Sequence, residues 1–338
     1  MIFRTPGYYR RFRCIAGDCR DSCCIGWEID IDEDTAAYYG SVEGDFGSRL
    51  RENISGGCFT LGEDERCPFL NSRNLCDIYT ELGEEHLCQI CSDHPRFYEW
   101  FGDVKEGGIG LSCEAAAALI LSEDMVLAEE EIQEEAFGEC DSGLHSLLCS
   151  AREDIFLHLQ NEDLLSALCT ALDYAEALQE NIDNGIYQLP EWEETSAAAV
   201  PDHAGVIWFY TSLEQISPDW APELRASAQR PAADLTADDI TMLRRIAVYF
   251  IYRYFLKGAH DGEILSRVKL AAVSVYIIAR LRRRGGDMLL TAKNYSKETE
   301  YCEENIEALC DAFYDTDIFT TSHIKGLLRE ELDLPGIS

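Results

Sequence analysis

Cysteine is concentrated in the first third of this chain, and this crowding is the feature that most limits how the chain can fold. Ten of the fifteen cysteines lie at or before Cys113, and five lie in the rest of the sequence. A segment of this kind holds its short elements together with disulfides or with thiolate-bound metal. The N-terminal residues lack the apolar core and cleavage site of a secretory signal. We therefore expect a cytoplasmic protein, in which metal binding is the commoner use of dense cysteines.

The spacing of these cysteines suits thiolate ligands. Two residues separate Cys88 from Cys91, which lets two thiolates from one tight turn reach a single ion. Soft thiolates select zinc or iron–sulfur clusters, and the spacing does not choose between the two. Neighbouring Cys23 and Cys24 point to opposite faces of an extended segment, so both rarely bind one ion. The candidate metal ligands are Cys14, Cys19, Cys23, Cys24, Cys67, Cys76, Cys88, Cys91 and Cys113.

Composition and charge narrow the classes of partner. The chain has 338 residues, of which 46 % are hydrophobic, enough to bury a substantial core. No apolar run approaches the roughly 18 residues needed to cross a bilayer. The formal net charge of −35 repels nucleic acid and anionic membrane surfaces, whereas a protein that offers lysines is complementary. The same acidity would also serve solubility alone.

Residues 1–115 are predicted to form a cysteine-rich, loop-rich module with short strands. The alternation of apolar and acidic residues from Trp27 to Asp32 is typical of a half-buried strand. Residues 67–70 and 75–79 flank a polar turn and are predicted to form a hairpin. Thr80 is a candidate N-cap for a short helix that follows.

Residues 116–338 are predicted to form an all-helical domain, which makes the fold mainly α. Leucine, alanine and glutamate recur at helical spacing through this part of the chain. Residues 183–235 are richer in proline and are expected to be an irregular connection with short helices. Helices are expected over Ala115–Phe137, Leu144–Ile182, Asp238–Leu256, Gly262–Arg284, Ser296–Tyr314 and Ser322–Glu331.

Several segments resemble one known family. The runs Phe12–Asp30, Cys67–Tyr79 and Leu82–Cys113 are similar to the flagellin lysine-N-methylase family and to a wider group of zinc- or iron-chelating cysteine-rich domains. The C-terminal runs Tyr249–Leu256 and Tyr295–Asn305 are similar to the methylase rather than to the chelating domain alone. Tyr301 departs from the family, in which a histidine is expected after the glutamate.

This resemblance implies an enzyme, a protein-lysine N-methyltransferase. It implies S-adenosylmethionine as methyl donor, a flagellin-like protein as substrate and a cysteine-bound iron–sulfur cluster of the 4Fe-4S type, with zinc as the alternative. The net charge, rather than the resemblance, argues against a nucleic-acid or membrane partner. The donor site is left open, because Gly107-Gly108-Ile109-Gly110 is more typical of a loop or strand edge than of a cofactor cradle.

Basic and polar residues of the helical part are candidates for the chemistry. Arg253 and Arg245 lie in a locally basic stretch and could hold the carboxylate of S-adenosylmethionine, or could simply pair with acidic residues of other helices. Glu298, Tyr301 and Asn305 are spaced to share one helix face, where they could deprotonate and orient an amine. The plain alternative is a solvated helix face.

Two other classes of function remain open from the sequence. One is a non-catalytic zinc- or iron-chelating binding module. The other is a helical interaction protein whose zinc only staples the small module. The long helical part favours the enzyme, because a bare chelating module has no need of it.

Overall fold

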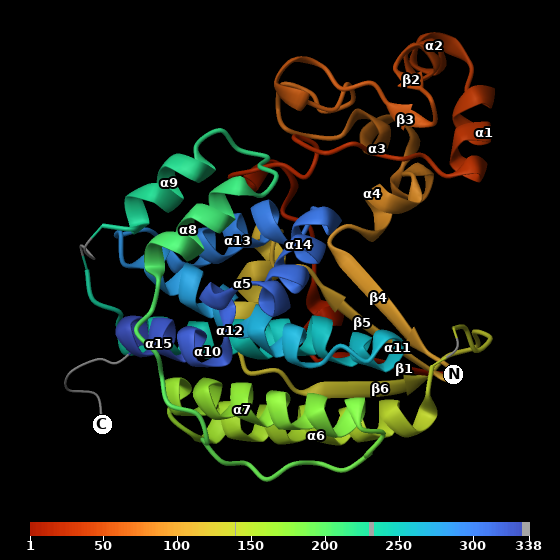
Figure 1. Cartoon of the computed structure of the whole chain (residues 1–338). Helices are drawn as coiled ribbons and strands as arrows, with labels where there is room; N and C mark the ends of the chain where they lie inside the picture. The colour runs from red at the N-terminus through yellow and green to blue at the C-terminus, as the bar shows by residue number, and fades with distance from the viewer. Residues whose placement is uncertain (139, 230–232, 333–338) are drawn as a thin grey trace.

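The computed structural model describes residues 1–138, 140–229 and 233–332 and contains two hydrophobic clusters. The smaller cluster belongs to the cysteine-rich part, between Ile29 and Cys91, and forms the outlying unit at the top of Figure 1. The larger cluster joins the helices to Tyr8, Phe12 and Leu111 of the N-terminal third. The fold is mainly α, as predicted. The division at residue 115 stays a prediction.

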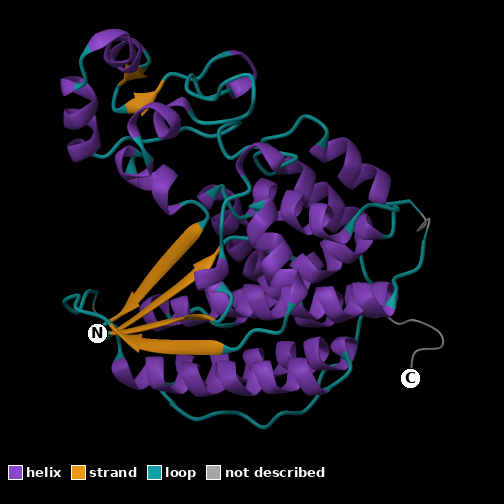
Figure 2. Cartoon of the chain, turned by 180° about the vertical axis from the view of Figure 1, so that it is seen from behind, coloured by secondary structure: helices purple, strands orange, loops and turns teal. Residues whose placement is uncertain are grey.

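A four-stranded sheet in the order β4-β5-β1-β6 lies at one side of the helical body (Figure 2). β1 (Ile2–Pro6) pairs in parallel with β5 (Val104–Ile109) and antiparallel with β6 (Leu127–Glu131). β4 (Arg96–Phe101) and β5 form an antiparallel hairpin that turns at Gly102. Gly107, predicted to lie in a loop or strand edge, is a residue of β5.

The cysteine-rich unit is built from short elements. Its hydrophobic cluster contains Tyr39, Leu50 and Phe69, which are completely buried. Its helices and strands are α1 (Glu33–Ser41), α2 (Gly44–Glu52), β2 (Ile54–Ser55), β3 (Cys58–Phe59), α3 (Asp77–Leu82) and α4 (Gln89–Asp93).

The helical body surrounds α12 (Leu265–Arg282), which is buried along nearly its whole length. It packs against α7, α10, α13, α14 and α15. The other helices are α5 (Glu114–Ser122), α6 (Ser142–Asn161), α7 (Leu164–Asp183), α8 (His203–Ser212), α9 (Trp220–Ser227), α10 (Ala237–Tyr254), α11 (Gly258–Asp261), α13 (Met288–Thr299), α14 (Glu303–Asp315) and α15 (Thr321–Leu332). No helix among the described residues is long and apolar enough to cross a membrane.

Three predicted helices are wrong in part. The helix expected over Leu144–Ile182 divides into α6 and α7 between Asn161 and Leu164. The helix expected over Ala115–Phe137 ends at Ser122, and β6 follows. The acidic side chains of Glu129 and Glu130 form ion pairs with Arg4 and Arg10, and these partners favour a strand beside β1 over a helix. The helix expected over Ser296–Tyr314 breaks after Thr299 into α13 and α14.

Two predictions for the cysteine module also need correction. Residues 27–32 form one isolated bridge, between Asp30 and Cys58, rather than a strand, although Ile29 and Ile31 are buried and Asp30 is exposed, as the alternation requires. The hairpin over residues 67–79 is reduced to one bridge between Leu70 and Cys76, because the chain enters α3 at Asp77. Thr80 is therefore inside a helix and is not its N-cap.

Candidate functional site

The turn between α13 and α14 carries Tyr301 to the contact between the cysteine-rich unit and the helical body. The Tyr301 ring lies 5.1 Å from the ring of Trp27 and 5.9 Å from that of His94. The guanidinium of Arg253 in α10 lies 5.5 Å from the centre of the Tyr301 ring. A side chain at Gly110 would collide with the phenol, because a Cβ placed there would be 2.3 Å from the Tyr301 hydroxyl.

Glu300, next to Tyr301, carries a carboxylate with no exposed side-chain surface. Its Oε1 accepts hydrogen bonds from the hydroxyls of Tyr249 (3.1 Å) and Tyr254 (3.0 Å), and lies 3.2 Å from a guanidinium nitrogen of Arg253. Its other oxygen, Oε2, is buried and has no hydrogen-bond partner among the described residues. A buried carboxylate oxygen is costly to leave unpaired, so Oε2 is an acceptor available to a bound donor group. We call Trp27, His94, Arg253, Glu300 and Tyr301 the Tyr301 site.

Burial sets the protonation of two members of this site. It raises the pKa of Tyr301 above its ordinary value, although the nearby Arg253 charge opposes the shift. It lowers the pKa of His94 to about 4. At neutral pH the site therefore holds an uncharged phenol and an uncharged imidazole beside the Arg253–Glu300 ion pair.

Three cysteine-bearing segments supply residues to this region. Cys24 lies three positions before Trp27, and Cys91 lies three positions before His94. Cys113 follows Leu111, whose backbone N–H donates to the Tyr249 hydroxyl at 3.1 Å. A group that tied these cysteines together would also fix the walls of the Tyr301 site.

The predicted metal ligands influence one another electrostatically, with the exception of Cys19. A hydrogen bond with Cys88 raises the pKa of Cys91, and burial and the charges of Cys24 and Cys67 add to the shift. Burial, with a contribution from Cys76, raises the pKa of Cys67 to about 11. Electrostatic interactions also connect Cys23 with Cys24 and Cys76, and Cys113 with Cys23 and Cys14.

The donor chemistry of this network fits a soft metal or an iron–sulfur cluster. All fifteen cysteines are free thiols. Of the predicted ligands, Cys67 and Cys88 belong to the smaller hydrophobic cluster, and Cys24, Cys76 and Cys91 pack against it. Cys23 precedes Cys24 in the sequence. Within the described residues, no three histidine, cysteine or acidic side chains are arranged as a ready ligand group. Thiols must lose their protons to bind metal, so loading must both draw the sulfurs together and release protons. The ligand roles of the nine cysteines stay predictions.

Glu298 and Asn305, predicted to share a face with Tyr301, point to a different part of the protein. The carboxylate of Glu298 accepts from the backbone N–H groups of Ile216 (2.8 Å) and Ser217 (2.9 Å). The side chain of Asn305 binds both the N–H and the carbonyl of Glu214, each at 2.9 Å. The break between α13 and α14 separates this pair from Tyr301, so the predicted shared face is not formed. The catalytic roles of the three residues stay predictions.

The two predicted cofactor arginines are also separated. Arg253 lies in the Tyr301 site, where its guanidinium also stacks on Phe97 at 4.7 Å. Arg245, two turns earlier in α10, is 2.9 Å from Asp124 and donates to the carbonyl of Leu121 at 2.7 Å. Arg245 therefore anchors the end of α5, and its role in binding a cofactor stays a prediction.

Glu300 was not identified as a site residue from the sequence, and neither was Tyr249. Both belong to the segments that resemble the methylase family, but nothing in their spacing indicates that they meet across 51 positions. The available signal was an acidic residue directly before Tyr301 together with the tyrosine-rich run of α10. Trp27, the first residue of the alternating segment in the cysteine module, packs against Tyr301.

Comparison with known proteins gives three relatives of limited coverage. A lysine-N-methylase of Salmonella typhimurium is 28% identical over 144 residues, which are 39% of this chain and 36% of that protein. The lysine-N-methylase of Salmonella choleraesuis gives the same identity and coverage. The flagellar biosynthetic protein FliU of Salmonella muenchen is 26% identical over 133 residues, which are 36% of this chain and 79% of that protein.

The matches therefore concern a part of each protein. The chain covers about a third of the length of the lysine-N-methylases that it matches. No family model matches the chain, and no solved structure matches it. These relatives confirm, at low identity, the similarity to the flagellin lysine-N-methylases that the sequence predicted.

Proposed function

We propose that this protein is a cytoplasmic enzyme that transfers a methyl group from S-adenosylmethionine to lysine side chains of flagellin or a similar protein. The observation that carries the proposal is the buried carboxylate of Glu300, whose Oε2 has no partner among the described residues. It lies within an aromatic site beside the cysteine-bearing segments. The names of the relatives give the reaction class.

The chemistry of lysine methylation fits this site. A lysine ammonium must lose a proton before its nitrogen can attack the methyl group of a sulfonium donor, which leaves as the thioether. Glu300 would accept that proton at Oε2 while its Oε1 stays bound to Tyr249 and Tyr254. The aromatic faces of Trp27 and Tyr301 favour a cationic side chain entering the site.

We propose that at least four of the nine candidate cysteines hold an iron–sulfur cluster, with zinc as the alternative. Such a cluster would supply a redox-active centre when bound. The residues of this chain would gain a fixed arrangement, because the segments that carry Trp27, His94 and Leu111 would be tied together. Arg253 would hold the Glu300 carboxylate in position through their contact at 3.2 Å.

The test begins with protein purified without oxygen and analysed for iron, sulfide and zinc. The protein is then incubated with S-adenosylmethionine and flagellin of the same organism, and lysine peptides are examined for mass shifts of one methyl unit. Methylation by the iron-loaded protein, lost on replacement of Cys23 or Cys67, supports the proposal. Metal-loaded protein that leaves flagellin unmodified would instead favour the chelating module.

A further inference from the structure

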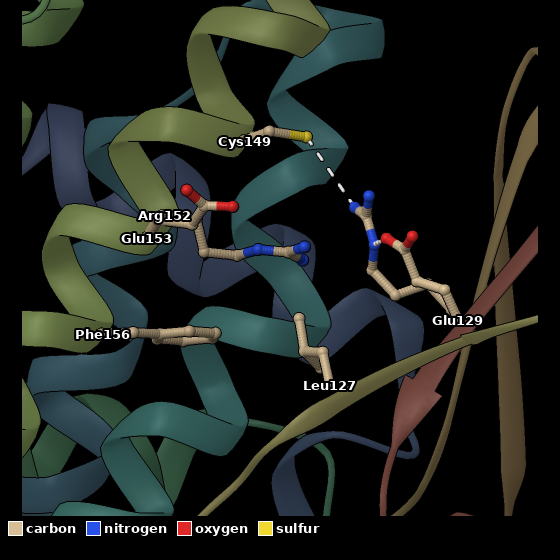
Figure 3. Close-up of a pocket in the computed structure, with 7 residues that line it drawn as sticks. Leu127, Glu129, Cys149, Arg152, Glu153 and Phe156 are labelled. Atoms are coloured by element: carbon tan, nitrogen blue, oxygen red, sulfur yellow. Dashed lines mark hydrogen bonds and ion pairs between the residues drawn. The ribbon is translucent and has the colours of Figure 1, made fainter.

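A cavity away from the Tyr301 site lies between α6 and the edge of the sheet (Figure 3). Its volume is about 310 Å³, at the lower end of the range usual for small-molecule sites. Four residues of α6 at helical spacing face two strands across it. The lining residues are Cys149, Arg152, Glu153 and Phe156 of α6, Arg4 of β1, and Leu127 and Glu129 of β6.

The inner wall of this cavity holds a buried cluster of charges. Arg152 has 2% of its side chain exposed, and its two terminal nitrogens donate to Glu106 at 2.7 and 2.6 Å. Arg4 donates to the same carboxylate at 3.0 Å. The Nε of Arg152 is buried and has no hydrogen-bond partner among the described residues. The cavity wall thus contains one buried N–H donor, on Nε of Arg152, that no described protein group satisfies, while Glu106 satisfies the terminal nitrogens.

The mouth of the cavity has the opposite character. Glu129 is exposed over about half of its side chain and binds Arg4 at 2.7 Å. Glu153 is exposed and forms no ion pair with another residue of the described chain. Figure 3 shows Leu127 and Phe156 on facing elements below the charged groups, where they form an apolar wall.

This arrangement discriminates among ligand charges. A simple anion would be repelled by the two carboxylates at the mouth, and a simple cation by the Arg4 and Arg152 guanidiniums inside, of whose two charges Glu106 offsets one. A molecule with a carboxylate and an ammonium on neighbouring atoms satisfies both, and an apolar side chain would lie against Leu127 and Phe156. We propose that this cavity binds the α-amino acid end of a small molecule, with its carboxylate toward Arg152 and its ammonium toward Glu153.

Two sources could supply that chemistry, a free amino acid such as methionine or the amino acid end of S-adenosylmethionine. The second source rests on the proposed function. It is compatible with the position of the cavity, because Arg152 stacks on Tyr252 at 5.3 Å and the next residue, Arg253, belongs to the Tyr301 site. The cavity and the Tyr301 site therefore flank the same turn of α10.

The inference is tested by isothermal titration calorimetry with L-methionine, S-adenosylmethionine and two controls, L-methioninamide and adenosine. We expect one of the first two to bind and both controls to fail, because neither control carries the carboxylate. Glu153→Gln should weaken binding about tenfold, since it removes one charge-assisted hydrogen bond. Phe156→Trp should abolish binding by filling the cavity. Glu180→Gln, an exposed glutamate of α7, is the matched control and should bind normally.

Location is checked separately through the Cys149 thiol, which lines the cavity. The bound ligand should slow alkylation of Cys149 as read by peptide mass spectrometry, and should leave alkylation of Cys310 unchanged. Competition between methionine and S-adenosylmethionine would identify the methyl donor as the source, whereas binding of methionine alone would identify a free amino acid. Binding by neither, or equal binding by Glu153→Gln and Phe156→Trp, would overturn the inference. Methylation of flagellin is assayed independently, so the two proposals can fail separately.

Discussion

Glu300 is the residue whose surroundings are hardest to explain by packing alone. One carboxylate oxygen receives two tyrosine hydroxyls and an arginine, while the other is buried without a partner among the described residues. A purely structural acid would be expected to use both oxygens, because an unpaired buried oxygen costs about 1–3 kcal/mol. The energetic cost is consistent with a group that is satisfied by substrate.

Glu300→Gln should therefore reduce flagellin methylation by about 10²- to 10⁴-fold, the usual range for loss of a general base. The amide can still accept from Tyr249 and Tyr254 through its oxygen, but the buried Arg253 loses its charged partner, so the thermal unfolding midpoint should fall and methylation is compared at a temperature where both proteins are folded. Tyr301→Phe is the matched variant, because it keeps the ring beside Trp27 and loses only a hydroxyl. Methylation is measured by mass spectrometry under single-turnover conditions. Full activity of Glu300→Gln would exclude Glu300 as the base.

The buried thiol of Cys67 gives the metal-free protein a specific pH dependence. Burial raises its pKa from the ordinary 9.0 to about 11, so the folded state favours the neutral thiol. The stabilisation is fully present below pH 9 and is lost as the pH rises toward 11, because the unfolded chain releases the proton first. For Cys67 this amounts to on the order of 2 kcal/mol.

Urea unfolding of the metal-free protein between pH 8 and 11 measures this loss. Cys67→Ala provides the control, because its remaining thiols and tyrosines still titrate while this one contribution is removed. The free energy of unfolding should fall less steeply with pH in Cys67→Ala than in the unmodified protein. Equal slopes would show that Cys67 titrates normally in the fold.

At the scale of single elements, the break between α13 and α14 organises the segment that follows α8. Glu298 satisfies two backbone N–H groups of residues 216–217, and Asn305 holds Glu214 from the other side of the break. Glu298→Ala should leave two donors without partners and cost about 1–3 kcal/mol. Hydrogen exchange at residues 214–217 should accelerate in this variant.

Glu303→Ala is the matched control for that experiment, because Glu303 is an exposed acid in the first turn of α14. It should leave exchange at residues 214–217 unchanged. Loss of methylation in Glu298→Ala with unchanged exchange would instead support the catalytic role predicted from the sequence.

The sequence predicted best those helices that are surrounded by apolar side chains along most of their length. α10 and α12 begin and end within three residues of the predicted bounds, since a continuous apolar pattern specifies a buried helix whatever its neighbours are. β6 and the break after Thr299 were missed because distant residues decide them. Arg4 pairs with Glu129 across 125 positions, and Tyr249 reaches Glu300 across 51.

The same distinction applies to the candidate site. Arg253 is a candidate by its residue type and Tyr301 by its helical spacing with Glu298, and the structure brings the two together. The unpaired oxygen of Glu300 and the small space at Gly110 were not predictable, because both depend on how the cysteine-rich unit packs against α10 and α13.

At the scale of the whole molecule, charge is the dominant feature. The chain carries a formal net charge of −35, and its fold leaves most acidic residues near the surface. A field of this sign attracts lysine-bearing surfaces and accelerates encounter, in favourable cases by about 10- to 10³-fold. Salt weakens the attraction between Arg253 and Glu300 only slightly, because a buried ion pair is screened far less than exposed charges.

Salt should therefore weaken substrate capture without slowing the chemical step. Raising ionic strength from about 0.01 M to 0.3 M shortens the screening length from roughly 30 Å to below 10 Å, which removes the long-range attraction. We expect kcat/KM for flagellin to fall severalfold over this range while kcat stays constant. Steady-state methylation at a series of flagellin concentrations measures both quantities. A short lysine peptide of zero net charge is the control substrate, and its kcat/KM should depend little on salt. A fall in kcat with salt for both substrates would mean that the charged site itself is exposed, contrary to the burial of Glu300.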